Sequence, residues 1–313
     1  MSNVFARFFT LLLTGIILCM AACSGGDGNA SVSDGKDDTS ADSSTLSIAV
    51  MPTLDCLPIY VAQRDGLFDR ESLSVRLCPF MAQMDCDTAI AGGTVQALVT
   101  DLVRGELLSL RGTPLRYVAS TDLQWQLLTS KAARIKQLKQ LDDKMVAVTR
   151  YSATALLADQ LVDSAKLVTE RVFRIQVNDV LVRLSMMETG VMDAMLLPEP
   201  QATVARMLQS NVVYDSSADT LRLGVIAFSE KALADTLRHQ QMQAFVRAYD
   251  SACDSIAQNG LTYYRDIIAD RCHVKLAVVD SLASQTTMRF LHAAEPRQSD
   301  IDRAKAWLGK VYH

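Results

Sequence analysis

Polar side chains that could bind a small molecule follow the ends of several apolar runs in this sequence. In the segment 149–154, Arg150 stands directly before a stretch with helical periodicity. The free backbone N–H groups at a helix start attract an anion, and the guanidinium of Arg150 could add two hydrogen bonds to a carboxylate, sulfonate or phosphate. A capped helix with a solvent-facing arginine is the other interpretation. This segment therefore makes an anionic ligand one hypothesis.

Acidic side chains at similar positions favour a ligand of the opposite charge. Asp55, Asp101 and Glu199 each follow an apolar run, and carboxylates there would attract a cation or an amine. Asp55 and Asp179 could equally be ordinary helix-start residues, and Asp101 could cap the next helix. The charge of the ligand therefore stays open. The residues that we expect to bind it are Thr53, Asp55, Gln83, Thr100, Asp101, Arg150, Tyr151, Ser152, Thr154, Asn178 and Glu199.

Residues for enzymatic chemistry are sparse in the same segments. The four histidines all come late, from His239 onward, which removes the usual general base and metal ligand. The patterns GxSxG, HExxH, GxxxxGK[ST] and GxGxxG do not occur. Cys56 is the one candidate nucleophile, and a structural cysteine is its competing interpretation. We expect no catalytic residue, no metal and no cofactor.

Ten short apolar runs, separated by amphipathic stretches, would position these loops. Alternation of strands and helices at this spacing predicts βαβ units and mostly parallel sheets. One series ends near Ser120 and a second begins near Gln126, and the run 223–229 could return the chain to the first sheet. Ligands bind beyond the carboxyl ends of strands in such sheets, so we expect a cleft between two lobes. The strands are expected at 46–51, 74–78, 96–100, 115–120, 126–130, 145–149, 173–177, 193–197, 212–215 and 223–229.

The first residues have the pattern of an export signal. The apolar stretch 8–20 follows Arg7 and is too short for a good membrane span. It ends in Met-Ala-Ala before Cys23, which resembles the lipobox of bacterial lipoproteins, where the cysteine is acylated. An ordinary cleaved signal is the alternative. Residues 1–22 would then be a lipoprotein signal peptide, and the polar, Asp-rich segment 23–44 a flexible tether.

Export permits disulfides, and five cysteines remain once the signal peptide and the anchor are set aside. An odd number leaves at least one thiol unpaired. Cys253 and Cys272 could pair with one another. A pair among Cys56, Cys78 and Cys86 could also form, and the sequence does not choose it.

Three segments resemble one known family, the solute-binding proteins for nitrate, sulfonates, taurine and thiamine-pyrimidine precursors. MPTLDCLPIYVAQRDGLFDRESLSVRL (51–77) has the family's P-x-Y-V-A-x-x-x-G-L-F pattern. GGTVQALVTDL (92–102) is similar to a second family stretch, except that Gln96 stands where Asp is usual. GVMDAMLLPEPQATVA (190–205) resembles the second-lobe segment with its Glu-Pro pair. The similarity spans roughly residues 46–229.

The resemblance implies a type II periplasmic binding protein of an ABC importer. Its fold would be α/β, with two lobes, each a mostly parallel sheet flanked by helices, and a cleft between them. Lobe 1 would comprise 45–122 plus 224–313, and lobe 2 would comprise 123–223. The resemblance further implies hinged lobe closure on a small polar ligand, which could be anionic or heterocyclic, and docking of the closed form on a membrane permease.

Together with the export signal, this predicts a monomer in the cell envelope, lipid-anchored at Cys23, periplasmic or surface-exposed. Nucleic acid is not an expected partner, because the net charge is −4 and no long basic run occurs. Two alternatives stay open. The first is an enzyme on the same fold, of the menaquinone-pathway or pyrimidine-forming type. The second is a surface adaptor that has lost solute binding.

Overall fold

The computed structural model describes residues 44–312. The expected signal peptide, the lipid attachment at Cys23 and the tether as far as residue 43 lie outside the described residues. Within residues 44–312, no helix is both long and apolar enough to cross a membrane.

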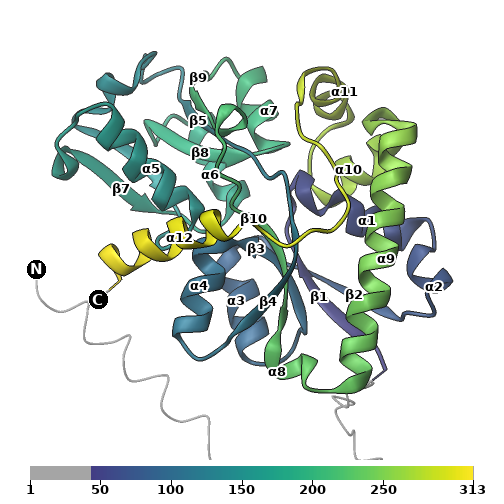
Figure 1. Ribbon diagram of the computed structural model, residues 1–313. Coiled ribbons are helices and arrows are strands. Elements are labelled where there is room, and N and C mark those ends of the chain that lie inside the picture. Colours follow the sequence, from purple (N-terminus) through teal and green to yellow (C-terminus); the bar gives the residue numbers. More distant parts are fainter. Residues whose placement is uncertain (1–43, 313) are drawn as a thin grey trace, which may run out of the picture. The chain divides into compact units, whose positions relative to one another are not determined.

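The first sheet has five strands in the order β2-β1-β3-β10-β4 (Figure 1). Strand β1 pairs in parallel with β2 and β3, whereas β10 runs antiparallel to β3 and β4. Every residue of β1, β3 and β10 is buried, as expected for strands covered on both faces. The strands are β1 (Leu46–Val50), β2 (Val75–Pro79), β3 (Ala97–Asp101), β4 (Leu115–Ser120) and β10 (Gly224–Ser229).

The second sheet repeats this arrangement, in the order β7-β6-β8-β5-β9. Here β5 is the reversed strand, antiparallel to β8 and β9. Each of the ten strands overlaps an apolar run predicted from the sequence, and the α/β, two-lobed arrangement is confirmed. The strands are β5 (Trp125–Thr129), β6 (Lys144–Val148), β7 (Val172–Gln176), β8 (Ala194–Pro198) and β9 (Asn211–Asp215).

Each reversed strand is the one that the chain enters after crossing between the sheets. The first crossing leads from β4 to β5, and the second leads from β9 to β10. The two crossings meet where the Thr121 N–H donates to the Gly224 carbonyl at 2.8 Å. A Cβ at Gly224 would lie 2.6 Å from the Leu123 Cβ and would also collide with the Thr121 hydroxyl. The crossings can therefore lie in contact only because residue 224 has no side chain.

Helices cover the sheets, and their ends follow sequence signals. Helix α1 has Pro58 in its first turn, and Gly66, at φ 66°, follows its end. Ser152 caps α5 with its hydroxyl on the Thr154 N–H. The α-helices are α1 (Leu57–Arg64), α2 (Leu67–Arg70), α3 (Gln83–Ala91), α4 (Leu102–Leu110), α5 (Ala153–Ser164), α6 (Val180–Glu188), α7 (Gln201–Met207), α8 (Glu230–Leu233), α9 (Thr236–Asn259), α10 (Arg265–Arg271), α11 (Leu276–Gln285) and α12 (Gln298–Val311). Short 3₁₀ turns include η1 (Leu54–Cys56) and η4 (Ser216–Ala218).

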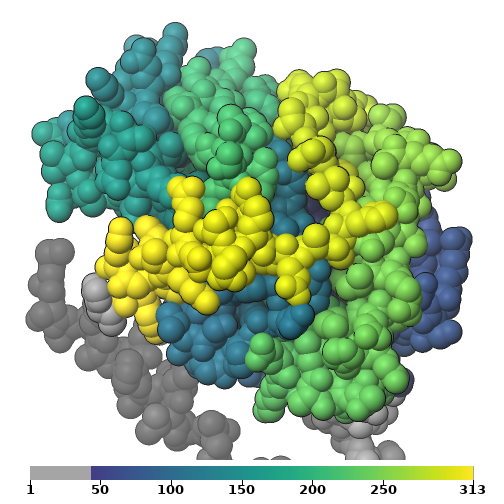
Figure 2. Space-filling view, in the orientation of Figure 1, coloured from purple at the N-terminus to yellow at the C-terminus, as the bar shows by residue number. Residues whose placement is uncertain are grey.

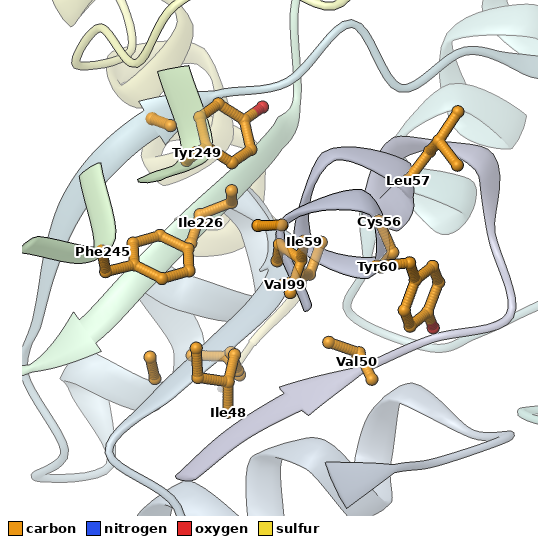
Figure 3. Packing of buried hydrophobic residues seen from close by; sticks show 14 of the residues in the cluster. Ile48, Val50, Cys56, Leu57, Ile59, Tyr60, Val99, Ile226, Phe245 and Tyr249 are labelled. Carbon is orange, nitrogen blue, oxygen red and sulfur yellow. The ribbon is translucent and has the colours of Figure 1, made fainter. Parts of the chain in front are cut away.

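The long helix α9 closes the core of the first sheet (Figure 3). Its Phe245 ring lies 5.6 Å from Phe228 of β10 and 6.0 Å from Phe68 of α2, between ring centroids. Ile48 and Ile226 belong to the same buried cluster. The buried residues of α9 recur every three or four positions, and its aromatic side chains supply large buried surfaces.

The C-terminal helix α12 contacts α4, which flanks the first sheet, and α5, which flanks the second. Figure 2 shows this C-terminal segment, in yellow, lying across parts of both. Ala304 and Leu308 are buried in a cluster with side chains of both helices, and the Trp307 indole N–H donates to Asp159 of α5 at 3.0 Å. Helix α12 is therefore shared, and the lobe boundaries placed from the sequence stay a prediction.

The disulfide that Cys253 and Cys272 could form is not present. Both residues are free, buried thiols, as are Cys56 and Cys86, and Cys78 is free and half-buried. The Cys253 thiol, on α9, is directed at the Leu291 carbonyl at 3.3 Å. Cys272 instead follows α10, and burial, followed by the nearby Asp55 carboxylate, raises the pKa of its thiol. The two side chains thus belong to the apolar core but come from different elements.

Candidate functional site

A cavity of about 70 Å³ lies at the edge where the strands of both sheets end. Its walls come from the loop after β1, from β3, from the first crossing and from the loops after β6, β7 and β8. This is the edge at which open α/β sheets bind ligands. The lining residues are Met51, Thr53, Asp55, Gln83, Val99, Thr100, Asp101, Leu123, Trp125, Thr149, Ser152, Thr154, Asn178, Val180, Arg183 and Pro198.

Eight of the eleven side chains predicted from the sequence line this one cavity. They come from loops of both lobes, so the structure brings together residues as distant along the chain as 53 and 178. The eight are Thr53, Asp55, Gln83, Thr100, Asp101, Ser152, Thr154 and Asn178.

Arg150 and Tyr151 do not line the cavity. Arg150 is exposed, and its guanidinium carbon lies 6.0 Å from the centre of the Tyr151 ring. Tyr151 has a φ of 54°, and its ring packs edge-on against Tyr312 with centroids 5.4 Å apart. The left-handed backbone at Tyr151 turns the chain immediately before α5. Both side chains therefore lie outside the site although their loop forms part of it.

Glu199 is buried, but its carboxylate is used within its own segment. It accepts from the Thr203 N–H at 3.0 Å and from the Thr203 hydroxyl at 2.7 Å. It also forms an ion pair with Arg206 at 2.8 Å. This carboxylate stabilises the start of α7 rather than lining the cavity. The Glu199 carbonyl contributes differently, by accepting from the Leu54 N–H at 2.8 Å.

Asp101 joins the two lobes at the cavity. Its Oδ1 accepts from the Arg104 N–H of α4 and from the Ala153 N–H of α5, each at 3.0 Å. One carboxylate therefore caps a helix of each lobe. The Asp101 carboxylate therefore lies at the start of α5, where the sequence suggested a bound anion. The neighbouring Thr154 N–H also has a partner, because it donates to the Ser152 hydroxyl at 3.1 Å.

Asp55 is a second buried carboxylate on the cavity wall, with 2% of its surface exposed. The Thr53 hydroxyl donates to its Oδ1 at 2.6 Å, and the Thr121 hydroxyl lies 3.4 Å from its Oδ2. Across residues 44–312, neither Asp55 nor Asp101 has a salt bridge to a basic side chain. Burial raises the pKa of Asp55 and that of Asp101 to about 6.

Arg183 is the basic residue on the cavity wall, and sequence reasoning missed it. Its Nε donates to the Val177 carbonyl at 2.7 Å, its Nη1 to the Leu196 carbonyl at 3.0 Å, and its Nη2 to the Thr149 hydroxyl. Burial lowers its pKa to about 10, so it stays charged at neutral pH. A signal did exist, because residue 183 falls on the buried stripe of α6 that contains Val180 and Met187.

Further contacts close the cavity by linking the lobes. The Gln201 side chain, at the start of α7, donates to the Pro52 carbonyl at 2.7 Å. The Arg104 guanidinium pairs with Asp87 in lobe 1 and donates to the Arg150 carbonyl at 3.2 Å. The two sides of the cavity are thus held together by hydrogen bonds on more than one flank.

Cys56, the candidate nucleophile, has the wrong environment for that role. It is fully buried, and burial followed by the neighbouring Asp55 raises its thiol pKa well above the ordinary value. A thiolate is the reactive form of cysteine, and a raised pKa disfavours it. Among the described residues, no group of three His, Cys, Asp or Glu side chains could hold a metal ion.

Comparison with known proteins agrees with this architecture. Residues 53–260 match the family model described as NMT1/THI5 like. A search of the curated proteins gives no match.

Solved structures of the same fold are numerous. The alkanesulfonate-binding protein SsuA from Xanthomonas axonopodis pv. citri, bound to MOPS, is 15% identical with a TM-score of 0.73, over 86% of this chain and 92% of that one. The periplasmic nitrate-binding protein NrtA from Synechocystis PCC 6803 is 10% identical with a TM-score of 0.69, over 82% and 74%. The ligand-binding component of an ABC-type import system from Staphylococcus aureus, with zinc bound, is 14% identical with a TM-score of 0.72, over 85% and 91%. The chain therefore belongs to the NMT1/THI5 like family and has the fold of the periplasmic binding proteins.

Proposed function

We propose that this protein is an extracytoplasmic solute-binding protein that delivers a small polar ligand to an ABC importer. One observation carries the proposal, namely the cavity whose polar walls come from both lobes. The lobes are connected by two crossings that meet at Gly224, so rotation about this contact would open the cavity. Closure would exclude water and strengthen the polar contacts to the solute. The sulfonate- and nitrate-binding proteins of the same fold support the same role.

The lipid anchor is a further part of this proposal, and it rests on the sequence before Cys23. Acylation there would hold the protein at a membrane surface, and the polar segment up to residue 44 would give the lobes reach toward a permease. A Cys23→Ser variant, expressed with radiolabelled palmitate, should lose its label and leave the membrane fraction. Label retained on the variant would contradict the anchor, and Cys78→Ser is the matched control.

The test of solute binding is native mass spectrometry of freshly purified protein, followed by thermal unfolding with a metabolite panel. A ligand that binds only the folded state raises the melting temperature, by about 2.7 kcal/mol of stability at one hundred times its Kd. We expect a co-purified molecule or a saturable shift. If the protein carries no ligand and no panel member shifts its melting temperature, solute binding is wrong, and the adaptor that lost its ligand becomes the better description.

The enzymatic alternative receives no support from Cys56. Its buried thiol lacks the basic neighbour that would activate it, since the groups around it are Asp55, Thr53 and the Met51 backbone. Rapid alkylation of Cys56 in the folded protein, with loss of a measured turnover, would reverse this conclusion.

A further inference from the structure

We propose that the solute is a small organic cation with N–H groups, such as an ammonium or amidinium ion, bound between Asp55 and Asp101. This inference rests on the proposed function and specifies its ligand. It opposes the anionic ligand that the sequence around Arg150 suggested. Some groups on the cavity wall already have partners within the chain, whereas others are left for a ligand.

The helix N-termini at the cavity, which could bind an anion, already have acceptors within the chain. Asp101 accepts hydrogen bonds from the Arg104 and Ala153 N–H groups, which are at the starts of α4 and α5. Asp179 accepts from the Leu181 and Val182 N–H groups at the start of α6, at 2.8 and 3.0 Å. The positive end of each of these helices therefore already has a carboxylate of this chain, and a second anion would be repelled.

The basic side chain on the wall is used as well. Arg183 is the one Lys, Arg or His among the described residues that line the cavity. Each of its three nitrogens has a partner within the chain, two of them backbone carbonyls. These bonds commit three of its five N–H groups and hold the guanidinium against the Val177 and Leu196 carbonyls and the Thr149 hydroxyl, so it acts as part of the wall.

The two buried carboxylates on the wall, in contrast, have no basic partner within residues 44–312. Asp55 and Asp101 have 2% and 6% of their surface exposed, and neither forms a salt bridge there. Burial of a carboxylate without a counter-ion is costly, so a cation from outside would stabilise the folded state. Gln83 also lines the cavity; its Nε2 donates to the Thr100 hydroxyl at 3.0 Å, and its amide oxygen is an acceptor.

The cavity also limits the size and shape of the ligand. A volume of about 70 Å³ exceeds what one water needs and suits a cationic group of a few heavy atoms. Apolar surfaces of Met51, Val99, Trp125 and Pro198 line the remainder and would contact the carbon part. An amidinium offers several N–H groups for charge-assisted hydrogen bonds to a carboxylate.

The test uses three probes of nearly equal shape: acetamidinium, acetamide and acetate. Thermal unfolding and calorimetric titration of the ligand-stripped protein at pH 7.5 should show saturable binding of acetamidinium and at least tenfold weaker binding of the other two. Nitrate and methanesulfonate complete the panel as anions of the classes named for the structural relatives.

Two variants locate the site. Asp55→Asn and Asp101→Asn keep an oxygen for the hydrogen bonds that each residue accepts, and each should weaken acetamidinium binding about tenfold or more. Glu106→Gln is the matched control, because Glu106 is a buried carboxylate of α4 outside the cavity. Its affinity should equal that of the wild type. Equal weakening in Glu106→Gln would show that the effect is not local and would overturn the assignment.

The outcomes separate the ligand class from the proposed function. Preferential binding of nitrate, methanesulfonate or acetate would overturn the cationic class and leave solute binding intact. If no probe binds, the charge of the co-purified molecule decides, with a cation supporting the inference and an anion or neutral molecule refuting it. Absence of both probe binding and a co-purified molecule would remove the inference together with the function on which it rests.

Discussion

The two lobes have the same strand arrangement at the cavity, but the charged side chains that they place on its wall have opposite sign. Both sheets place a reversed strand fourth in an otherwise parallel order, next to the strand whose end borders the cavity. Lobe 1 contributes Asp55 and Asp101, which have no salt bridge within residues 44–312. Lobe 2 contributes Arg183, each of whose nitrogens donates to a partner in its own lobe.

This difference shows that the charge of a residue on a cavity wall does not measure the charge available to a ligand. The Arg183 guanidinium donates to the Val177 and Leu196 carbonyls of its own lobe, so its role is structural. The Asp55 carboxylate lowers the stability of the empty protein instead, because burial without a cation disfavours its charged form. A site built in this way gains stability when a counter-ion enters it.

The largest effect should come from removing the guanidinium of lobe 2. Arg183→Ala removes three hydrogen bonds, two of them to backbone carbonyls, and creates a cavity behind α6, which should destabilise the protein by about 3–5 kcal/mol. Urea unfolding followed by circular dichroism measures this change. The neighbouring Val182 is exposed, so Val182→Ala should change stability by less than about 0.5 kcal/mol. Similar midpoints for the two variants would mean that Arg183 is free to serve a ligand.

The carboxylates of lobe 1 should give the next largest effect, visible as a pH dependence. The pKa of Asp55 rises from 3.8 to about 6 on folding, so between these values the folded protein holds a proton that the unfolded chain has released. Stability from this group is therefore greatest at low pH and falls as the pH rises through about 6. The loss at pH 7.5 is on the order of 3 kcal/mol. Neighbouring Cys56, Cys272 and Tyr249 have raised pKa values and stay neutral there.

Asp55→Asn isolates this contribution. The unliganded variant should be more stable than the wild type at pH 7.5, by about 2–3 kcal/mol, and should gain about half as much at pH 5. Melting temperatures of both proteins at the two pH values test this. A variant that is less stable than the wild type at pH 7.5 would show that the Asp55 charge is compensated inside the protein, and the contrast between the lobes would disappear.

Much of the fold could be predicted from the sequence because its signals are local. Ten apolar runs became ten strands, since short β-branched and aliphatic segments bounded by turns have few other ways to be buried. From the sequence, the run 223–229 could return the chain to the first sheet, and β10 does so. The shared position of α12 could not be predicted, because the Trp307–Asp159 contact joins residues 148 positions apart.

The site was predicted less completely, because a loop can be identified without knowing which of its side chains face inward. Arg150 and Ser152 belong to one loop, yet only Ser152 reaches the cavity. The left-handed φ of Tyr151 sets which side chains of the loop face the cavity, and this angle could not be predicted from the sequence. Arg183 was overlooked for the opposite reason, since it sits within a helix whose neighbours are apolar. An arginine on an apolar stripe is a signal that could have revealed it.

A smaller effect should follow from forcing apart the crossings that join the two cavity faces. Gly224→Ala places a methyl group against Thr121 and Leu123, which should cost about 1–3 kcal/mol through overpacking. Gly309→Ala is the control, because a Cβ there meets nothing within 4 Å inside α12, and it should stabilise by about 0.5–1 kcal/mol. If Gly224→Ala is neutral while solute affinity is unchanged, the contact between crossings does not set the cavity.

The smallest expected effect is that of Arg150→Ala, and it tests the comparison most directly. The Arg150 side chain is exposed and lies outside the cavity, while the contact from its carbonyl to Arg104 survives truncation. Stability should change by less than about 0.5 kcal/mol. Solute affinity, measured by calorimetry beside Asp55→Asn, should stay at the wild-type value. A tenfold loss of solute affinity in Arg150→Ala would mean that the loop turns when a solute binds. Lobe 2 would then supply a positive charge to the solute, from a side chain that lies outside the cavity in this structure.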